Sequence, residues 1–214
     1  MSKPTKPPSE ESLTALLEKH ACPVRFHEVR TRFLGNIATP DPEASPLQAL
    51  HALWGGELPV FDSMDEANAL IAALVHGLWN DLARHQRRNQ PFRLTRVPME
   101  PTNASLAQVS QVRREELDGF IEGLFNSHEA IDLPERAHRA VGYLREIRGM
   151  MAGLYDLMAG NPDAEDPVEL AATSKQLREL TRIMETEMHE AVLSCTRARR
   201  QMLDRTHTGH LTVH

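Results

Sequence analysis

The chain has 214 residues, of which 41% are hydrophobic and 5% aromatic, and its formal net charge is −6. This length and apolar content are sufficient for one domain with a packed core, whereas so few aromatic residues are unusual for a β-rich protein. The negative charge excludes a general nucleic-acid binder held by charge alone, although it leaves room for a local basic patch.

The compartment follows from the termini and the cysteines. No apolar run approaches the roughly 18 residues needed to span a bilayer, and the N-terminal MSKPTKPPSEES lacks the apolar core of a signal peptide. Its composition predicts a disordered tail over residues 1–10. Cys22 and Cys195 lie far apart and outside any C-x-x-C motif, so we expect no zinc site and no disulfide. A reduced cytoplasmic protein without membrane contact is therefore expected.

The first elements in chain order are short helices. Ser9 or Ser12 can serve as N-cap for an amphipathic helix that Pro23 ends. Apolar spacings of three and four favour a second helix over residues 24–38, with a strand through residues 23–29 as the less favoured alternative. A short helix then ends at Gly55 and Gly56, where a left-handed cap costs little.

The firmest helix prediction covers residues 64–88. Ser63 and Glu66 form an S-x-x-E capping box, in which the hydroxyl accepts from the Glu66 amide and the carboxylate reaches the Ser63 amide. Apolar residues hold a helical rhythm up to Leu82. A second stripe of mostly small side chains predicts that this helix is packed on two sides at the centre of a bundle; its members are Ala69, Ala72, Ala73, His76, Gly77 and Asn80.

The second half of the chain predicts longer helices. One covers residues 106–127, and Pro134 opens another that continues to residue 158. After the break GNPDAEDP, which ends at Pro167, residues 168–205 contain no proline or glycine. Their apolar residues follow a seam close to a heptad repeat: Leu177, Leu180, Met184, Met188, Ala191, Cys195, Ala198 and Met202.

Two helices joined by a short turn predict an antiparallel hairpin over residues 134–206. At 1.5 Å per residue its second helix would be roughly 57 Å long and its first about 37 Å. The last turns of the long helix must therefore pack on the N-terminal helices, pair with another subunit or lie in solvent. The predicted fold class is all-α: a compact helical bundle over residues 11–133, followed by the long antiparallel helical hairpin. Residues 207–214 are expected to be a mobile tail containing histidines.

Two segments share an outline of a helix with an interior glycine, a polar turn and another helix. They are RTRFLGNIATPDPEASPLQALHALWGG and ELDGFIEGLFNSHEAIDLPERAHRAVGYL. With LWGGELPVFDSMDEANALIAALVHGLWN between them, this layout resembles the YecA/YgfB-like family of uncharacterised bacterial proteins over about residues 26–160. The resemblance implies an all-helical fold and supplies no catalytic residues. Some members end in a cysteine-rich zinc module, which this chain replaces with the long helix, so that metal role does not carry over.

Few residues suggest catalysis. Glu135 and His138 form an E-x-x-H, but a di-iron bundle needs a second such unit, which the sequence lacks. Cys22 has His20 and His27 nearby in sequence, which could favour a thiolate nucleophile, although a structural cysteine is favoured. We expect no cofactor and no resident metal. In the terminal tail, His207, His210 and His214 could bind nickel or zinc adventitiously.

The favoured function is a non-enzymatic adaptor or regulator that works by protein–protein contact through the hairpin and its extended C-terminal helix, with self-association through the same seam as a further expectation. The predicted interaction residues are Met184, Met188, Cys195, Arg197, Arg199, Arg200 and Met202. One alternative is a metal- or cofactor-binding helical enzyme using His76, Glu135, His138 and His189. Another is a regulator that contacts nucleic acid through two arginine clusters, namely Arg84, Arg87, Arg88, Arg93 and Arg96, then Arg197, Arg199, Arg200 and Arg205.

Overall fold

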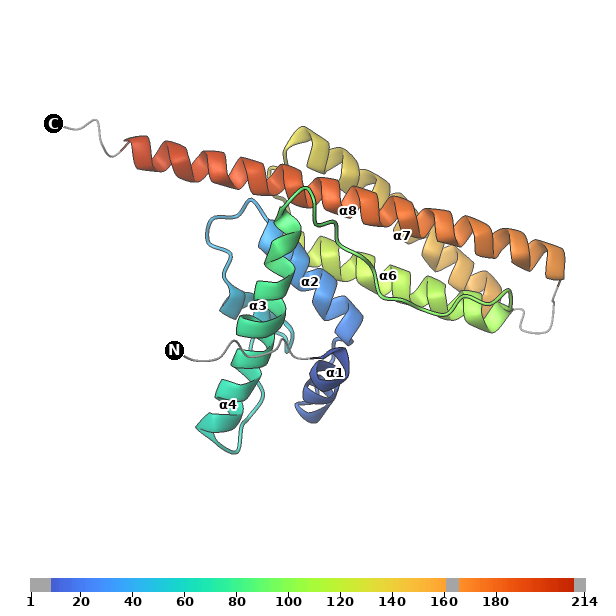
Figure 1. The fold of residues 1–214 in the computed structure, drawn as a ribbon, viewed down its shortest axis with the longest axis horizontal. Helices are drawn as coiled ribbons and strands as arrows, with labels where there is room; N and C mark the ends of the chain where they lie inside the picture. The colour runs from blue at the N-terminus through green and yellow to red at the C-terminus, as the bar shows by residue number, and fades with distance from the viewer. Residues whose placement is uncertain (1–8, 161–165, 210–214) are drawn as a thin grey trace.

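The computed structural model describes residues 9–160 and 166–209, with the backbone alone for residues 205–209. Every regular element in these ranges is helical, which confirms the predicted all-α class (Figure 1). The elements are α1 (Glu10–Lys19), α2 (Phe26–Ala38), α3 (Pro46–Ala52), α4 (Met64–Ile71), the π-helix η1 (Ala72–Trp79), α5 (Asn80–Leu82), the 3-10 helix η2 (Ala83–Gln86), α6 (Asn103–Phe125), α7 (Glu135–Gly160) and α8 (Pro167–Gly209).

Local sequence signals set the helix starts. The Ser9 hydroxyl accepts from the Ser12 amide, and the Ser63 hydroxyl accepts from the Glu66 amide at 3.2 Å, as predicted. The Glu66 carboxylate, however, accepts from the Asp62 amide at 3.0 Å rather than from Ser63. It also pairs with Lys19 of α1 at 2.6 Å, so this helix start is tied to the N-terminal helix. The capping box therefore also makes a tertiary contact.

The helix predicted over residues 64–88 forms as one continuous run from α4 to η2, but it is not the centre of the fold. Its apolar face is buried at Leu70, Leu74 and Leu78. The predicted second packing face is wrong, because most of the small-residue stripe is open to solvent. The π-helix η1 bonds five residues apart instead of four, so its residues drift from the face that a uniform helix would give them. The exposed members are Ala69, Ala72, His76 and Asn80.

The centre of the fold is instead the crossing of α2 and α6, where the two backbones touch. A Cβ atom added at Gly119 would lie 2.7 Å from the Glu28 carbonyl oxygen. Atoms added at Gly35 and Gly123 would overlap the facing backbones at Phe120 and Arg32 even more closely. These are the interior glycines of the two segments with the same outline, and they allow the two helices to pack directly together.

Helices α7 and α8 lie along α6 and run in opposite directions (Figure 1). Arg136, at the start of α7, pairs with Glu187 of α8, whereas Leu154 near its end lines the same cavity as Leu170 at the start of α8. With 43 residues against 26, α8 is about 64 Å long and α7 about 39 Å. The C-terminal turns of α8 consequently extend beyond α7 and project from the molecule in Figure 1.

Candidate functional site

Helix α8 carries all seven residues predicted for partner contact, and their burial separates them. Met184, Met188 and Cys195 are 0% exposed and belong to the hydrophobic core. The apolar seam of α8 is covered by α2, α6 and α7 of the same chain. The prediction that these three side chains contact a partner is therefore corrected: they hold α8 on the body of the molecule.

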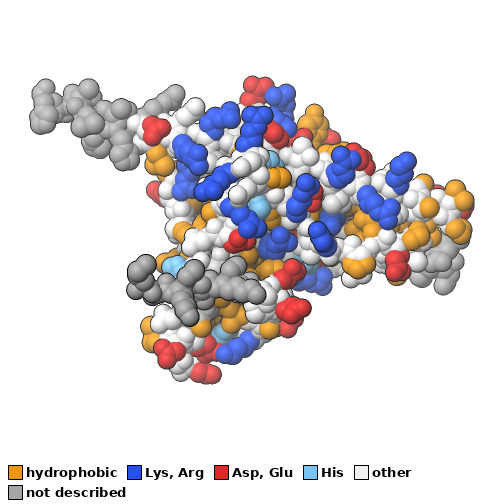
Figure 2. Space-filling view, in the orientation of Figure 1, with side chains coloured by type: hydrophobic (Ala, Val, Ile, Leu, Met, Phe, Trp, Pro, Cys, Tyr) orange, Lys and Arg blue, Asp and Glu red, His pale blue; other side chains and the backbone are white. Residues whose placement is uncertain are grey.

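The other predicted residues lie toward the projecting end of α8. Arg197 and Arg200 are exposed, Arg199 is half-buried and Met202 is 43% exposed. Figure 2 shows lysine and arginine side chains gathered over this part of α8. The surface of α8 that is open to a partner is therefore basic.

Arg197 and Arg200 line a cavity of about 450 Å³, which we call the arginine pocket. Two more arginines reach it from distant parts of the chain: Arg88 follows η2, and Arg136 lies in the first turn of α7. The full lining is Gln86, Arg88, Arg136, Glu190, Leu193, Ser194, Thr196, Arg197, Arg200 and Gln201. Three segments far apart in sequence thus converge on one basic cavity.

Arg88 is brought to α8 by backbone and side-chain anchors around it. The His189 Nε2 lies 3.4 Å from the Arg88 carbonyl oxygen. Two residues earlier, the side-chain amide of Gln86 donates to the Ile37 carbonyl oxygen at 3.0 Å. The next residues are also fixed, because the Leu94 amide donates to Glu185 of α8 at 3.1 Å. The segment that carries Arg88 is therefore docked on α8 at several points.

Arg136 is positioned by two carboxylates of α8. Its Nη1 and Nη2 donate to the two oxygens of Glu187 at 2.7 and 3.3 Å, and its Nε lies 3.5 Å from Glu190. Hydrogen bonding to Glu187 raises the pKa of the Arg136 guanidinium above its ordinary value. Since its donors are engaged inside the protein, Arg136 contributes mainly charge to the pocket.

Thr196 adds a buried donor to the lining. Its side chain belongs to a residue only 6% exposed, and its Oγ1 has no hydrogen-bond partner among the described residues. A buried hydroxyl without a partner costs stability, so native structures leave few of them. Ser194 is a second hydroxyl-bearing residue of the same lining. Two residues with neutral hydroxyl groups therefore stand beside the guanidinium groups of the pocket.

The charges of the pocket do not balance. Arginine stays protonated at any physiological pH. Among the described residues of the lining, Glu190 is the one carboxylate against four guanidinium groups. No ion pair joins Arg88, Arg197 or Arg200 to a carboxylate in the described part of the chain. The cavity consequently favours an anion, and guanidinium groups suit carboxylate or phosphate oxygens.

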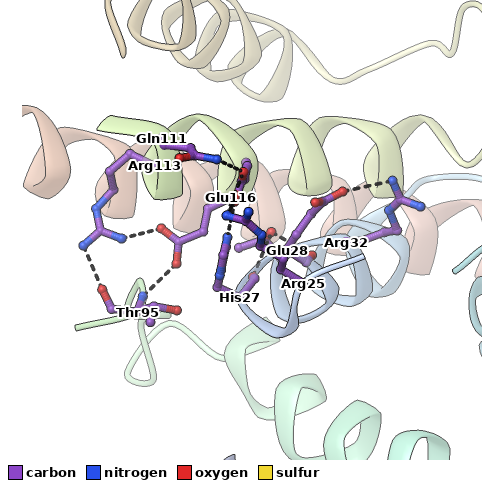
Figure 3. A network of polar contacts seen from close by, with 10 residues as sticks. Arg25, His27, Glu28, Arg32, Thr95, Gln111, Arg113 and Glu116 are labelled. Carbon is purple, nitrogen blue, oxygen red and sulfur yellow. Dashed lines mark hydrogen bonds and ion pairs between the residues drawn. The ribbon is translucent and has the colours of Figure 1, made fainter. Parts of the chain in front are cut away.

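A different group of arginines is balanced inside the protein (Figure 3). Arg113 pairs with Glu116, which is 0% exposed, and donates to the Thr95 carbonyl oxygen at 2.8 Å. Glu116 in turn accepts from the Thr95 amide at 2.8 Å. Arg30 also bonds the Thr95 hydroxyl at 3.0 Å and stacks over Phe92. This network fixes the connection between η2 and α6, which also carries Arg88 at its start.

Glu28 lies beside this network on α2. Burial, together with the nearby carboxylates of Glu122, Glu115 and Asp118, raises the pKa of Glu28 to about 7 from 4.5, against the opposing charge of Arg32. Its contacts are with side chains of the α2–α6 crossing, and the Arg32 Nη2 donates to it at 3.3 Å. Glu28 therefore titrates near neutral pH as part of the helix crossing.

The cysteines do not form an activated nucleophile. Burial raises the pKa of the Cys22 thiol, and it raises the pKa of Cys195 to about 12. His27 is engaged by Glu115 at 2.7 Å, while His20 packs edge-on against Phe61. The arrangement needed for a cysteine–histidine nucleophile is thus not formed.

The residues of the metal-enzyme alternative do not come together. His76 is exposed on η1, Glu135 and His138 are exposed on α7, and His189 contacts the backbone of Arg88. Within residues 9–160 and 166–204, no three His, Cys, Asp or Glu side chains are arranged to hold a metal ion. His210, His214 and the side chain of His207 lie outside the described residues.

Each of the two arginine clusters contributes to the pocket only in part. From the first cluster, Arg88 reaches it, whereas Arg84 pairs with Asp81 and Arg93 pairs with Glu185. Sequence reasoning missed Arg136 and Thr196, because the first was read as part of an E-x-x-H and the second had no motif. For Arg136 the sequence offers one signal, since an antiparallel pairing of α7 and α8 brings residue 136 near residues 187–190. For Thr196 it offers none.

Among the described residues, no helix is long and apolar enough to cross a membrane. Comparison of the chain with protein-family models, with curated proteins and with solved structures finds no match. The resemblance to the YecA/YgfB-like family consequently stays a prediction from the sequence pattern.

Proposed function

We propose that this chain is a non-enzymatic adaptor that binds an acidic segment of a partner protein in the arginine pocket of α8. One observation carries the proposal: four guanidinium groups from three distant segments line one cavity, and three of them, those of Arg88, Arg197 and Arg200, have no ion-pair partner among the described residues. In a chain of net charge −6, this local excess of positive charge is not a consequence of general basicity. Such a site recognises carboxylate-bearing side chains through charge and paired hydrogen bonds.

The position of the pocket supports the same proposal. Its lining combines Arg136 in the first turn of α7 with α8 residues up to Gln201, and Arg88, Arg197, Arg200 and Gln201 in this lining are exposed, so an extended segment has access to it. The segments that carry Arg88 and Arg136 are both tied to α8, by His189 and Glu187 respectively. A pocket held in this way is formed before the partner arrives, which lowers the entropic cost of binding.

The test is binding of a labelled glutamate-rich peptide, measured by fluorescence anisotropy. We expect Arg197→Glu/Arg200→Glu to weaken binding by at least about tenfold, because both charges lie in the pocket. The matched control is Lys175→Glu/Arg182→Glu, which makes the same change of charge on an exposed part of α8 outside the pocket. Equal losses in both variants would show attraction by net charge only and would overturn the proposal.

The same assay, repeated at several salt concentrations, distinguishes a nucleic-acid partner from a protein partner. A partner held in a single pocket loses affinity moderately with salt, whereas a nucleic acid contacted at many phosphates loses it steeply. Duplex DNA or RNA that binds more tightly than the peptide, with such a slope, would replace the protein partner by the nucleic-acid alternative.

A separate observation favours self-association through α7. Tyr143, Met150 and Leu157 are 51%, 55% and 56% exposed and recur every seven residues on its outer face. This spacing is that of a helix seam. We propose that two chains pair along it. Met150→Glu should then reduce the mass measured by light scattering to that of one chain, and a wild-type protein that is monomeric at all concentrations excludes it.

A further inference from the structure

We propose that the arginine pocket is a phosphate site, which holds a phosphate monoester on a side chain of the partner's docking segment. This inference rests on the proposed function, since it specifies the chemistry of the segment that docks there. It starts from the number and kind of donors in the pocket rather than from its charge alone.

The lining contains more donors than one carboxylate can accept. Arg88, Arg197 and Arg200 have no ion-pair partner among the described residues, and each guanidinium is a planar fork of N–H groups. Ser194 and Thr196, which each carry a hydroxyl, belong to the same lining. A carboxylate has two oxygens in one plane, whereas a phosphate monoester presents three terminal oxygens in three directions. The donors here are carried by two separate segments, α8 and the segment at Arg88, and such a set matches the three oxygens of a phosphate better than the two of a carboxylate.

Thr196 is the most specific part of the argument. It is 94% buried, it lines the cavity, and its hydroxyl has no partner among the described residues. The Thr196 Oγ1 is itself covered in the structure, so it reaches an anion in the cavity after rotation of the side chain, and the anion then supplies its hydrogen-bond partner beside the guanidinium groups. We therefore assign Thr196 as a ligand of the phosphate, together with Arg88, Arg197 and Arg200.

The two carboxylates near the pocket have different roles. Glu187 holds both Nη atoms of Arg136, so that arginine supplies charge and is not assigned as a direct ligand. Glu190 lines the cavity and lies 3.5 Å from the Arg136 Nε. Its negative charge opposes an incoming anion, and its side chain is 43% exposed. Removing that charge should strengthen phosphate binding.

The lining also separates a phosphorylated protein segment from a nucleic acid. It contains no aromatic side chain on which a base could stack. The four arginines surround one cavity of about 450 Å³, which is the size of a site for one group with its neighbours. A single phosphate on a flexible segment suits this arrangement.

The experiment compares three versions of one acidic peptide that differ at a central position, which is serine, glutamate or phosphoserine. Isothermal titration calorimetry on the full chain gives each affinity. We expect the phosphoserine peptide to bind at least about tenfold more tightly than the glutamate peptide. Inorganic phosphate should compete with it, although weakly. If the glutamate and phosphoserine peptides bind equally, the phosphate inference fails and the proposed function stands; if none binds, both fail.

Two variants test the assigned ligands without removing charge. Thr196→Val keeps the shape of the side chain and removes its hydroxyl, so it should reduce the preference for phosphoserine severalfold while leaving the thermal midpoint unchanged or higher. Arg197→Lys/Arg200→Lys keeps both charges and loses the planar forks, and it should reduce the same preference. Glu190→Gln should tighten binding of the phosphoserine peptide. A preference that survives both ligand variants would overturn the assignment.

Discussion

Two groups of arginines in this molecule have opposite surroundings. Arg113 is buried and matched by Glu116, by the Thr95 carbonyl oxygen and by Thr181. Arg197 and Arg200 stand at a cavity whose guanidinium groups outnumber its carboxylates. A charge whose partners all lie within the chain stabilises the fold, whereas a group of charges without enough partners is available to a ligand. An arginine is therefore assigned a structural or a binding role according to whether carboxylates of the same chain neutralise its charge.

Removing the buried carboxylate that pairs with Arg113 should have the largest effect on the free energy of unfolding. Glu116→Ala leaves the Arg113 charge buried without its carboxylate, and we expect a loss of about 3–5 kcal/mol in the free energy of unfolding. Urea denaturation measures this loss. Glu179→Ala is the matched control, because it breaks an ion pair of the same i,i+3 spacing that is exposed to solvent. The control should lose less than about 1 kcal/mol. Similar losses in both would contradict the balance argument.

Glu28 allows the same region to be tested by pH. Its folded pKa of about 7 lies above the ordinary 4.5, so the folded state holds its proton more strongly than the unfolded state. The resulting stability is present below about pH 4.5 and is lost as the pH rises through 7. Glu28→Gln removes this loss of unfolding free energy, because the glutamine side chain does not ionise. We expect the variant to gain up to about 3 kcal/mol over the wild type at pH 8 and much less at pH 5. An equal gain at both pH values would exclude the titration of Glu28 as the cause.

The backbone contact between α2 and α6 gives an intermediate effect. Gly123→Ala places a methyl group against the backbone of Arg32, which cannot move as a flexible side chain would. We expect a loss of about 1–3 kcal/mol in unfolding free energy, measured by thermal or urea denaturation. Gly149→Ala on α7 is the control. Nothing lies within 4 Å of its added Cβ, so it should stabilise by up to about 1 kcal/mol through helix propensity. The comparison fails if both variants change stability in the same direction.

The arginine pocket should show the smallest effect on folding. Arg197→Ala/Arg200→Ala removes two exposed side chains that have no internal ion pair among the described residues. We expect unfolding free energy to change by less than about 0.5 kcal/mol, while binding of the acidic peptide is lost. The same urea titrations measure the first and anisotropy the second. A large loss of unfolding free energy would show that Arg197 and Arg200 stabilise the fold, as Arg113 does.

Much of the fold could be predicted from local signals. Ser63 and Glu66 fixed the start of α4, and both Gly55 and Gly56 have the left-handed backbone expected after α3, with φ of +75° and +108°. The apolar seam of α8 was found by spacing, and it is buried at Leu177, Met184, Met188, Ala191 and Cys195, whereas Met202 at its end is exposed. The error was in assigning Met184, Met188 and Cys195 to a partner, because spacing shows that a face is apolar but not which chain covers it.

The candidate site was predicted only in part, for a related reason. Arg197 and Arg200 were identified as interaction residues, but Arg136 and Thr196 were not. A residue on a helix surface has no sequence signal for what lies opposite it. Only the pairing of α7 with α8 and the docking of the segment at Arg88 show that these groups line one cavity.

The sequence by itself determined the all-helical class, several helix starts and an uninterrupted C-terminal helix, because caps, glycines, prolines and apolar spacing act over a few residues. That helix was predicted to residue 205, whereas α8 continues to Gly209 and takes in the first residues of the tail predicted over 207–214. The tertiary structure decided the rest. It placed the α2–α6 crossing at the centre, since three glycines allow backbones to touch there. It left the small-residue face of residues 64–86 in solvent. It also brought Arg88, Arg136, Arg197 and Arg200 together in one pocket, because only the packing of distant segments decides which charges lie next to each other.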